Sequence, residues 1–128
     1  MYIAKQINFF KILLTACVLL PFVLNSHALK EAIQSTERSS ENALRDQYRN
    51  PYETLKFFGL KDNQVVVELS PGGGWYTEIL APYLKKKGEL IAAHYNPETS
   101  AYYARSRTAF DKKIASNNMF SEVRAVEL

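Results

Sequence analysis

The decisive stretch of this chain is QVVVELSPGGG, at residues 64–74. Its first half is an apolar, β-branched run without alternation, which is typical of a strand buried on both faces in a parallel sheet. Its second half is a glycine-rich bend, followed by apolar side chains at helical spacing. The sequence therefore predicts a strand, a tight turn and a helix. In open α/β sheets, ligands bind at such a turn, outside the carboxyl end of the strand.

Two further strands are expected downstream, at 89–95 (ELIAAHY) and 122–128 (EVRAVEL). The helix after the bend is expected over 75–87, kinked or shortened by Pro82. Asn96-Pro97-Glu98 indicates the start of a second helix, because it offers a cap, a first-turn proline and an acid near the positive helix end. The order β-α-β-α-β calls for right-handed crossovers and a parallel sheet. The predicted fold class is therefore α/β, with a parallel sheet.

N-terminal helices are expected to precede this sheet. The segment 42–58 has helical spacing in two pieces that are separated at Asn50-Pro51. Pro51 suits the first turn of the second piece, with Asn50 as its cap. Residues 29–41 are polar and weakly patterned, and they are interpreted as a lead-in arm. The expected domain thus covers residues 42–128.

The first 28 residues have the pattern of a secretory signal peptide. Lys5 and Lys11 precede the apolar run 12–24, which is shorter than the roughly 20 residues that span a bilayer. Ser26 and Ala28 then provide the small residues of a cleavage site. We therefore expect cleavage after Ala28 and a periplasmic or secreted product that meets a membrane only through its uncleaved signal.

The only cysteine, Cys17, follows Leu14-Thr15-Ala16, which resembles a lipoprotein box. Lipidation at Cys17 is the alternative, but it fits less well because the apolar run continues to Leu24. Without the first 28 residues, 14 basic and 13 acidic side chains remain. This near-neutral body does not have the clustered positive charge of a nucleic-acid-binding protein.

The glycine bend is the segment expected to hold a ligand. A P-loop is excluded, because no Gly-Lys-Ser/Thr follows the glycines. Gly72 and Gly74 match the first part of the dinucleotide fingerprint, but Thr77 occupies the place of its third glycine. An oxidoreductase-type nucleotide module is therefore disfavoured.

The bend resembles motif I of class I S-adenosylmethionine (SAM)-dependent methyltransferases, acid-x-Gly-x-Gly-x-Gly. Glu68, Gly72 and Gly74 match this motif, whereas Ser70 replaces its first glycine. More closely, the segments RNP (49–51), FFG (57–59) and VELSPGGGWYTE (67–78) resemble a group of exported bacterial proteins that are predicted methyltransferases.

This resemblance implies SAM as cofactor and a role for each matching residue. The backbone of Gly72, Gly73 and Gly74 would pass beside the methionine part of SAM. Glu68 would anchor the loop or meet the ligand's ammonium group through water. The ribose-binding acid of related folds corresponds to His94, which accepts one hydrogen bond where a carboxylate accepts two; Asn96 or Glu98 is the alternative.

The resemblance also implies what this sequence does not contain. The family's Rossmann-like domain has more strands than the three expected here, so the resemblance implies a partial Rossmann-like sheet, with residues 42–128 as the N-terminal half of the domain. The residues for the methyl acceptor normally follow this half. We therefore expect a truncated product with at most weak SAM binding, no turnover, and association through its third strand. Because SAM is made in the cytosol, the alternative is an exported, non-enzymatic binding protein with the same fold. Catalytic residues and the acceptor are not assigned, and no metal site is expected.

Overall fold

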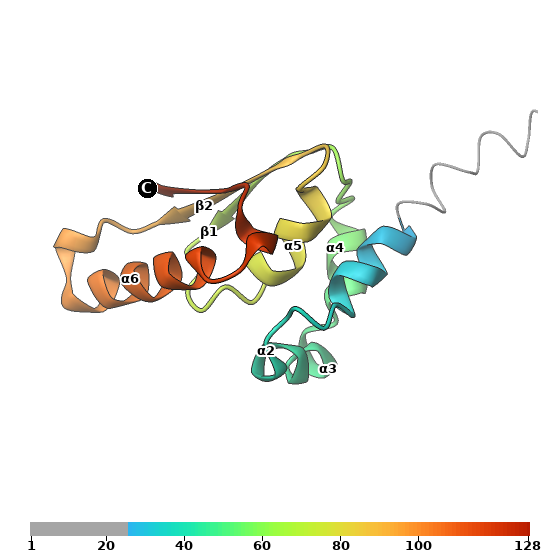
Figure 1. Ribbon diagram of the computed structural model, residues 1–128, viewed down its shortest axis with the longest axis horizontal. Coiled ribbons are helices and arrows are strands. Elements are labelled where there is room, and N and C mark those ends of the chain that lie inside the picture. The colour runs from blue at the N-terminus through green and yellow to red at the C-terminus, as the bar shows by residue number, and fades with distance from the viewer. Residues whose placement is uncertain (1–25) are drawn as a thin grey trace, which may run out of the picture.

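The computed structural model describes residues 26–128, which form a mixed α/β structure around a three-stranded parallel sheet (Figure 1). The strand order is β1-β2-β3, so β2 lies in the centre. Chain order alternates strand and helix, as the sequence predicts. The elements are α2 (Ser40–Leu44), α3 (Asp46–Arg49), α4 (Pro51–Phe57), β1 (Val65–Leu69), α5 (Thr77–Leu84), β2 (Glu89–His94), η1 (Pro97–Thr99), α6 (Ala101–Ala115), η2 (Asn118–Phe120) and β3 (Val123–Glu127).

All three expected strands are confirmed, each within a residue or two of its predicted ends. Val65 of β1 is in register with Glu89 of β2, and Leu90 of β2 with Val123 of β3. Parallel pairing brings the carboxyl ends of the strands to one edge of the sheet. The glycine bend, residues 70–76, leaves the sheet at this edge.

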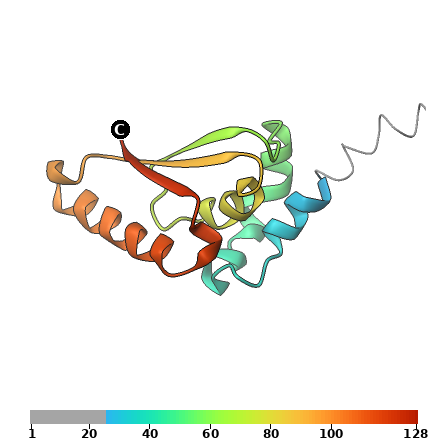
Figure 2. The same ribbon diagram turned by 45° about the horizontal axis from the view of Figure 1, so that its top comes forward.

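The helices α5 and α6 lie on the same face of the sheet (Figures 1 and 2). α5 supplies the centre of the core, where Ile79 and Leu84 are almost fully buried. Phe110 of α6 and Leu90 of β2 are buried as well. The core therefore lies between one face of the sheet and these two helices.

The opposite face of the sheet is open, and the prediction that β1 is buried on both faces is wrong. Val65, Val67 and Leu69 are 64%, 52% and 67% exposed. Their neighbours Val66 and Glu68 point to the helix-covered face and are half-buried. An apolar run indicates that both faces of a strand are suited to burial. It does not show that other elements of the chain pack on both faces.

The segment 29–41 is not the polar arm that its composition suggests. Residues 26–33 are helical, and Leu29 and Ala32 are buried in the core. Arg38, in the following turn, is buried as well. The segment has few apolar residues, but these point inward and attach it to α4 and α5.

Cys17 and all but the last three residues of the expected signal peptide lie outside the described residues. The predicted cleavage point of this signal peptide, after Ala28, falls within the helical residues 26–33. Cleavage, lipidation and export stay predictions. No helix within 26–128 is long and apolar enough to cross a membrane.

Local signals determine most helix boundaries. Pro51 occupies the first turn of α4, but Asn50 does not cap it through its side chain and instead has a φ of 44°. α5 begins only at Thr77 and contains Pro82, which confirms a short helix. Asn96-Pro97-Glu98 begins only the short 3-10 helix η1, with Asn96 as its N-cap. The longer helix α6 starts after Ser100, whose side chain accepts a hydrogen bond from the Tyr103 N–H.

Candidate functional site

The glycine bend has an alternating backbone conformation. Ser70, Gly72 and Gly74 have φ of 51°, 55° and 74°, whereas φ is not positive at Pro71 and Gly73 between them. Glycine adopts positive φ without strain, which explains its use at 72 and 74. Alternating φ signs are the pattern of a backbone nest, in which successive N–H groups turn toward a common side and can bind an anion.

The N–H groups of two glycines in the bend are free to bind such a ligand. Ser70 N–H donates to the Ala93 carbonyl at 2.8 Å, and Gly74 N–H donates to the Pro71 carbonyl at 2.8 Å. Within residues 26–128, the N–H groups of Gly72 and Gly73 form no hydrogen bond. A Cβ at Gly73 would meet no atom within 4 Å, and one at Gly72 would only touch the Ser70 carbonyl at 4.0 Å. Side chains at these two positions would therefore point into open space, and we call this the open side of the bend.

Glu68 connects the end of β1 to the start of α5. Its carboxylate accepts a hydrogen bond from the Thr77 hydroxyl at 2.6 Å. Burial raises the pKa of Glu68 above 4.5, although hydrogen bonds from Thr77 and the charge of Lys113 oppose this shift. Of the two roles implied by the resemblance, this geometry favours anchoring the loop, because the carboxylate is already used within the protein.

His94 does not lie where a ribose-binding residue is needed. Its side chain is 4% exposed on the helix-covered face, with its ring 4.5 Å from that of Phe110. Its Nε2 has no hydrogen-bond partner among residues 26–128. Burial and the nearby Arg107 charge lower the pKa of His94 below 6.5, while Asp111 opposes this effect. His94 is therefore a neutral core residue.

The two alternatives to His94 differ in their surroundings. The Asn96 side chain accepts a hydrogen bond from the Glu98 N–H at 2.7 Å, so its oxygen is already used. Glu98 is exposed in η1, directly beyond the carboxyl end of β2. Glu98 therefore has an exposed carboxylate at this edge of the sheet, whereas the side-chain oxygen of Asn96 is already bonded.

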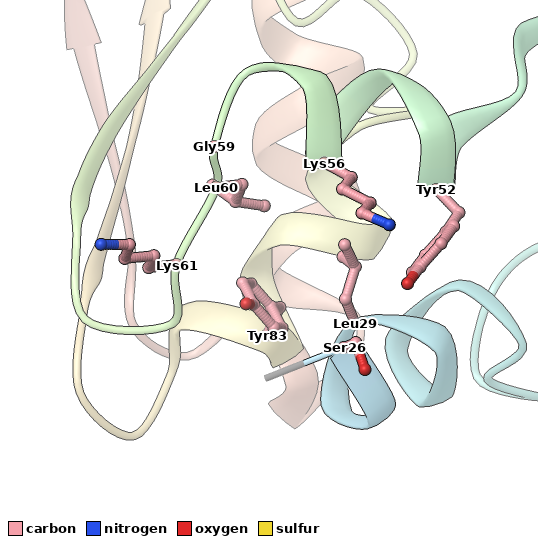
Figure 3. A pocket seen from close by; sticks show the side chains of 8 residues that line it. All are labelled: Ser26, Leu29, Tyr52, Lys56, Gly59, Leu60, Lys61 and Tyr83. Atoms are coloured by element: carbon pink, nitrogen blue, oxygen red, sulfur yellow. The ribbon is translucent and has the colours of Figure 1, made fainter. Parts of the chain in front are cut away.

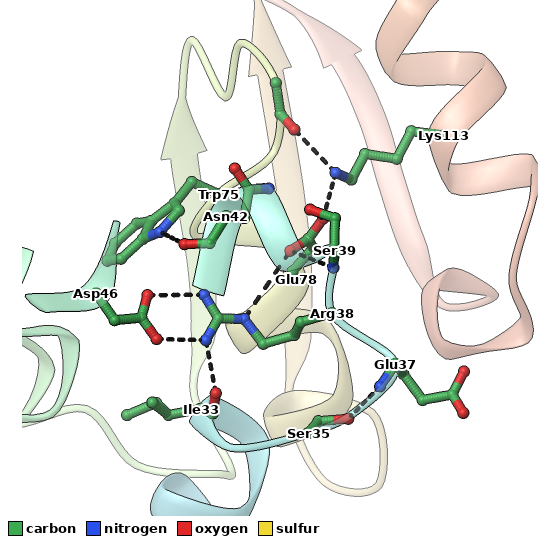
Figure 4. A network of polar contacts seen from close by, with 11 residues as sticks. Ile33, Ser35, Glu37, Arg38, Ser39, Asn42, Asp46, Trp75, Glu78 and Lys113 are labelled. Carbon is green, nitrogen blue, oxygen red and sulfur yellow. Dashed lines mark hydrogen bonds and ion pairs between the residues drawn. The ribbon is translucent and has the colours of Figure 1, made fainter. Parts of the chain in front are cut away.

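A buried carboxylate, Glu78 of α5, joins three segments behind the bend (Figure 4). It is 2% exposed and accepts hydrogen bonds from the Ser39 hydroxyl at 2.9 Å and from the Lys113 ammonium. Lys113 also donates to the Gly73 carbonyl at 3.0 Å. Arg38 forms a two-point ion pair with Asp46, at 2.6 and 2.9 Å. Sequence reasoning missed this network, because no local pattern marks the contacts of Glu78 and Lys113, whose partners lie 35–40 positions away in the sequence.

Trp75 connects the bend to the N-terminal helices through contacts with Asn42 and Arg49. It is 4% exposed, and its Nε1 donates to the Asn42 carbonyl at 2.8 Å. The Arg49 guanidinium lies 4.5 Å from the centre of its ring system, a distance that allows a cation–π contact. The Tyr76 ring packs edge-on against Trp75 with ring centroids 4.5 Å apart.

A separate apolar pocket lies near the other end of α5, away from the bend (Figure 3). Leu29 and Leu60 contribute its apolar lining, and Tyr52, Tyr83 and Lys56 contribute polar ends. The sequence patterns do not indicate this pocket, because its walls come from the helical residues 26–33, α4, the turn 59–61 and α5.

Comparisons with known proteins do not identify this chain: no family model matches it, and no curated protein or solved structure shows a significant match. Within the described part of the chain, no group of three or more His, Cys, Asp or Glu residues is placed to hold a metal ion. The glycine bend is therefore the candidate site on its geometry alone.

Proposed function

We propose that this chain is a SAM-dependent methyltransferase-like protein with a Rossmann-like fold, and that its glycine bend binds the methionine part of SAM. The observation that carries this proposal is the pair of free N–H groups at Gly72 and Gly73, on an open bend outside the carboxyl ends of parallel strands. Open α/β sheets bind their ligands at this position.

The chemistry of the bend suits the methionine carboxylate of SAM. A backbone nest binds an anion, and the positive end of the α5 dipole adds to the attraction. Glu68 and Thr77 hold the start of α5 in place through their 2.6 Å hydrogen bond. Glu98 takes the place of His94 as the residue proposed to bind the ribose hydroxyls, because its carboxylate is exposed beyond β2.

The bend supports a dinucleotide ligand less well. The place of the third fingerprint glycine is occupied by Thr77, which is fully buried and whose hydroxyl is used by Glu68. That glycine normally allows close packing of helix and strand.

The test is calorimetric titration of the full chain with SAM and, separately, with NAD. The variant Gly73→Val adds its side chain on the open side, where a Cβ meets no atom within 4 Å and φ is not positive. We expect SAM binding by the natural chain, no NAD binding, and loss of SAM affinity in G73V by about tenfold or more.

Ala109→Val, at an exposed position of α6, is the control for added bulk. It is expected to bind SAM as the natural chain does. Absence of SAM binding by the natural chain, or equal affinity in G73V, would contradict the proposal. NAD binding without SAM binding would instead support an oxidoreductase-type nucleotide module.

A further inference from the structure

The peptide between Gly73 and Gly74 is held at both of its polar ends. Its N–H, on Gly74, donates to the Pro71 carbonyl at 2.8 Å. Its carbonyl, on Gly73, accepts a hydrogen bond from Lys113 at 3.0 Å. Rotation of this peptide would break both bonds. These two bonds therefore restrict the bend to one backbone conformation, whereas free glycine residues change between several conformations at little cost.

Lys113 is itself fixed in place. It lies in the last turn of α6, and its ammonium binds the buried Glu78 carboxylate as well as the Gly73 carbonyl. Its Cδ and Cε lie 3.2 and 3.3 Å from the position that a Cβ on Gly74 would take, so its stem covers this side of the bend. Glu78 is in turn fixed by the backbone and hydroxyl of Ser39 (Figure 4).

We propose that Lys113 is a positioning residue for the ligand site. By fixing the Gly73–Gly74 peptide, it holds the alternating backbone conformation of the bend, and with it the arrangement of the free N–H groups of Gly72 and Gly73. It does so through Gly73 and not by contact with the ligand, since its ammonium is used within the protein. The gain is preorganisation, which lowers the entropy lost when a ligand binds. This inference rests on the proposed function.

The experiment compares Lys113→Met with Lys112→Met in the full chain. Lys112 is the preceding residue on α6, is exposed and forms no ion pair among the described residues, so its substitution removes the same charge without touching the bend. In calorimetric titrations with SAM, K113M is expected to bind about tenfold or more weakly. K112M is expected to bind like the natural chain, and Lys113→Arg is expected to restore part of the affinity.

A second variant separates positioning from stability. K113M leaves the Glu78 carboxylate buried, with the Arg38 Nε 3.9 Å away as its nearest remaining cation. Removal of one partner of a buried ion pair is strongly destabilising. The double variant E78Q/K113M removes both charges and keeps an oxygen for the Ser39 hydroxyl. We expect it to fold, as circular dichroism would show, and to bind SAM as weakly as K113M.

A measurement without ligand tests the role of Lys113 independently of the proposed SAM binding. The carbonyl ¹³C shift of Gly73 and the amide shift of Gly74, measured by NMR, are expected to change in K113M and E78Q/K113M but not in K112M. If the natural chain binds no SAM, the proposed function fails, and these shifts still decide whether Lys113 holds the bend. Natural shifts in the double variant, or natural SAM affinity in a folded K113M, would overturn the inference.

Discussion

Gly88 lies where the turn after α5 meets the turn before β1, and it is the glycine with the least room. A Cβ at this position would overlap the Gln64 carbonyl and lie 2.9 Å from the Asp62 carbonyl and 3.0 Å from Leu84 Cδ2. Two of these three neighbours are backbone atoms, which cannot rotate away. The Gln64 carbonyl also accepts the Glu89 N–H at 3.0 Å, where β1 and β2 begin to pair.

The substitution Gly88→Ala is therefore expected to lower the free energy of unfolding. Forcing an extra methyl group into a packed site costs about 1–3 kcal/mol. Displacing the Gln64 carbonyl weakens a hydrogen bond worth about 1 kcal/mol. The lower entropy of the unfolded alanine chain offsets about 0.4–1 kcal/mol of this cost. The net loss is expected to be about 2 kcal/mol.

The assay is urea unfolding followed by fluorescence of Trp75, the only tryptophan, which is buried in the folded chain. Gly73→Ala is the matched control, because its Cβ meets no atom within 4 Å and φ is not positive. It is expected to unfold at the natural urea concentration or slightly above it. A natural midpoint for G88A, or an equal loss in G73A, would refute the reasoning from local space.

Three further predictions concern the helix-covered and open faces of the sheet. Because the pKa of buried His94 is lowered, the unfolded chain binds a proton that the folded chain does not; stability is expected to fall below about pH 6.5. The urea midpoint of His94→Leu is expected to depend less on pH than that of the natural chain between about pH 7 and 5.5. The same pH dependence in both chains would contradict this. Since burial raises the pKa of Glu68, stability linked to that group falls as pH rises through the raised pKa. Glu68→Gln, which keeps an acceptor for Thr77, is expected to raise the urea midpoint at pH 7 more than at pH 4, and a lower midpoint at pH 7 would disprove it. Val67→Lys, on the open apolar face, is expected to reduce self-association in sedimentation velocity without changing the urea midpoint, whereas unchanged association would show that this face is not used.

The sequence by itself determined the order of elements and the position of the bend. The β-branched run before residue 70, the glycines after it and the helix start at Asn96-Pro97-Glu98 are local signals, each readable over a few residues. They predicted all three strands correctly. They also led to the hypothesis that a ligand approaches the backbone of Gly72, Gly73 and Gly74, which stays a prediction.

Tertiary structure alone decided which side chains are buried and which meet. The run Val65–Leu69 is apolar except for Glu68, yet helices pack on only one face of it (Figure 2). His94 has the spacing of a ribose-binding residue but points under Phe110, because the alternation along β2 turns it inward. Lys113 reaches Gly73 only because α6 folds back beside the bend. Such contacts depend on how elements pack over long sequence separations, and the local periodicity of a single sequence does not carry that information.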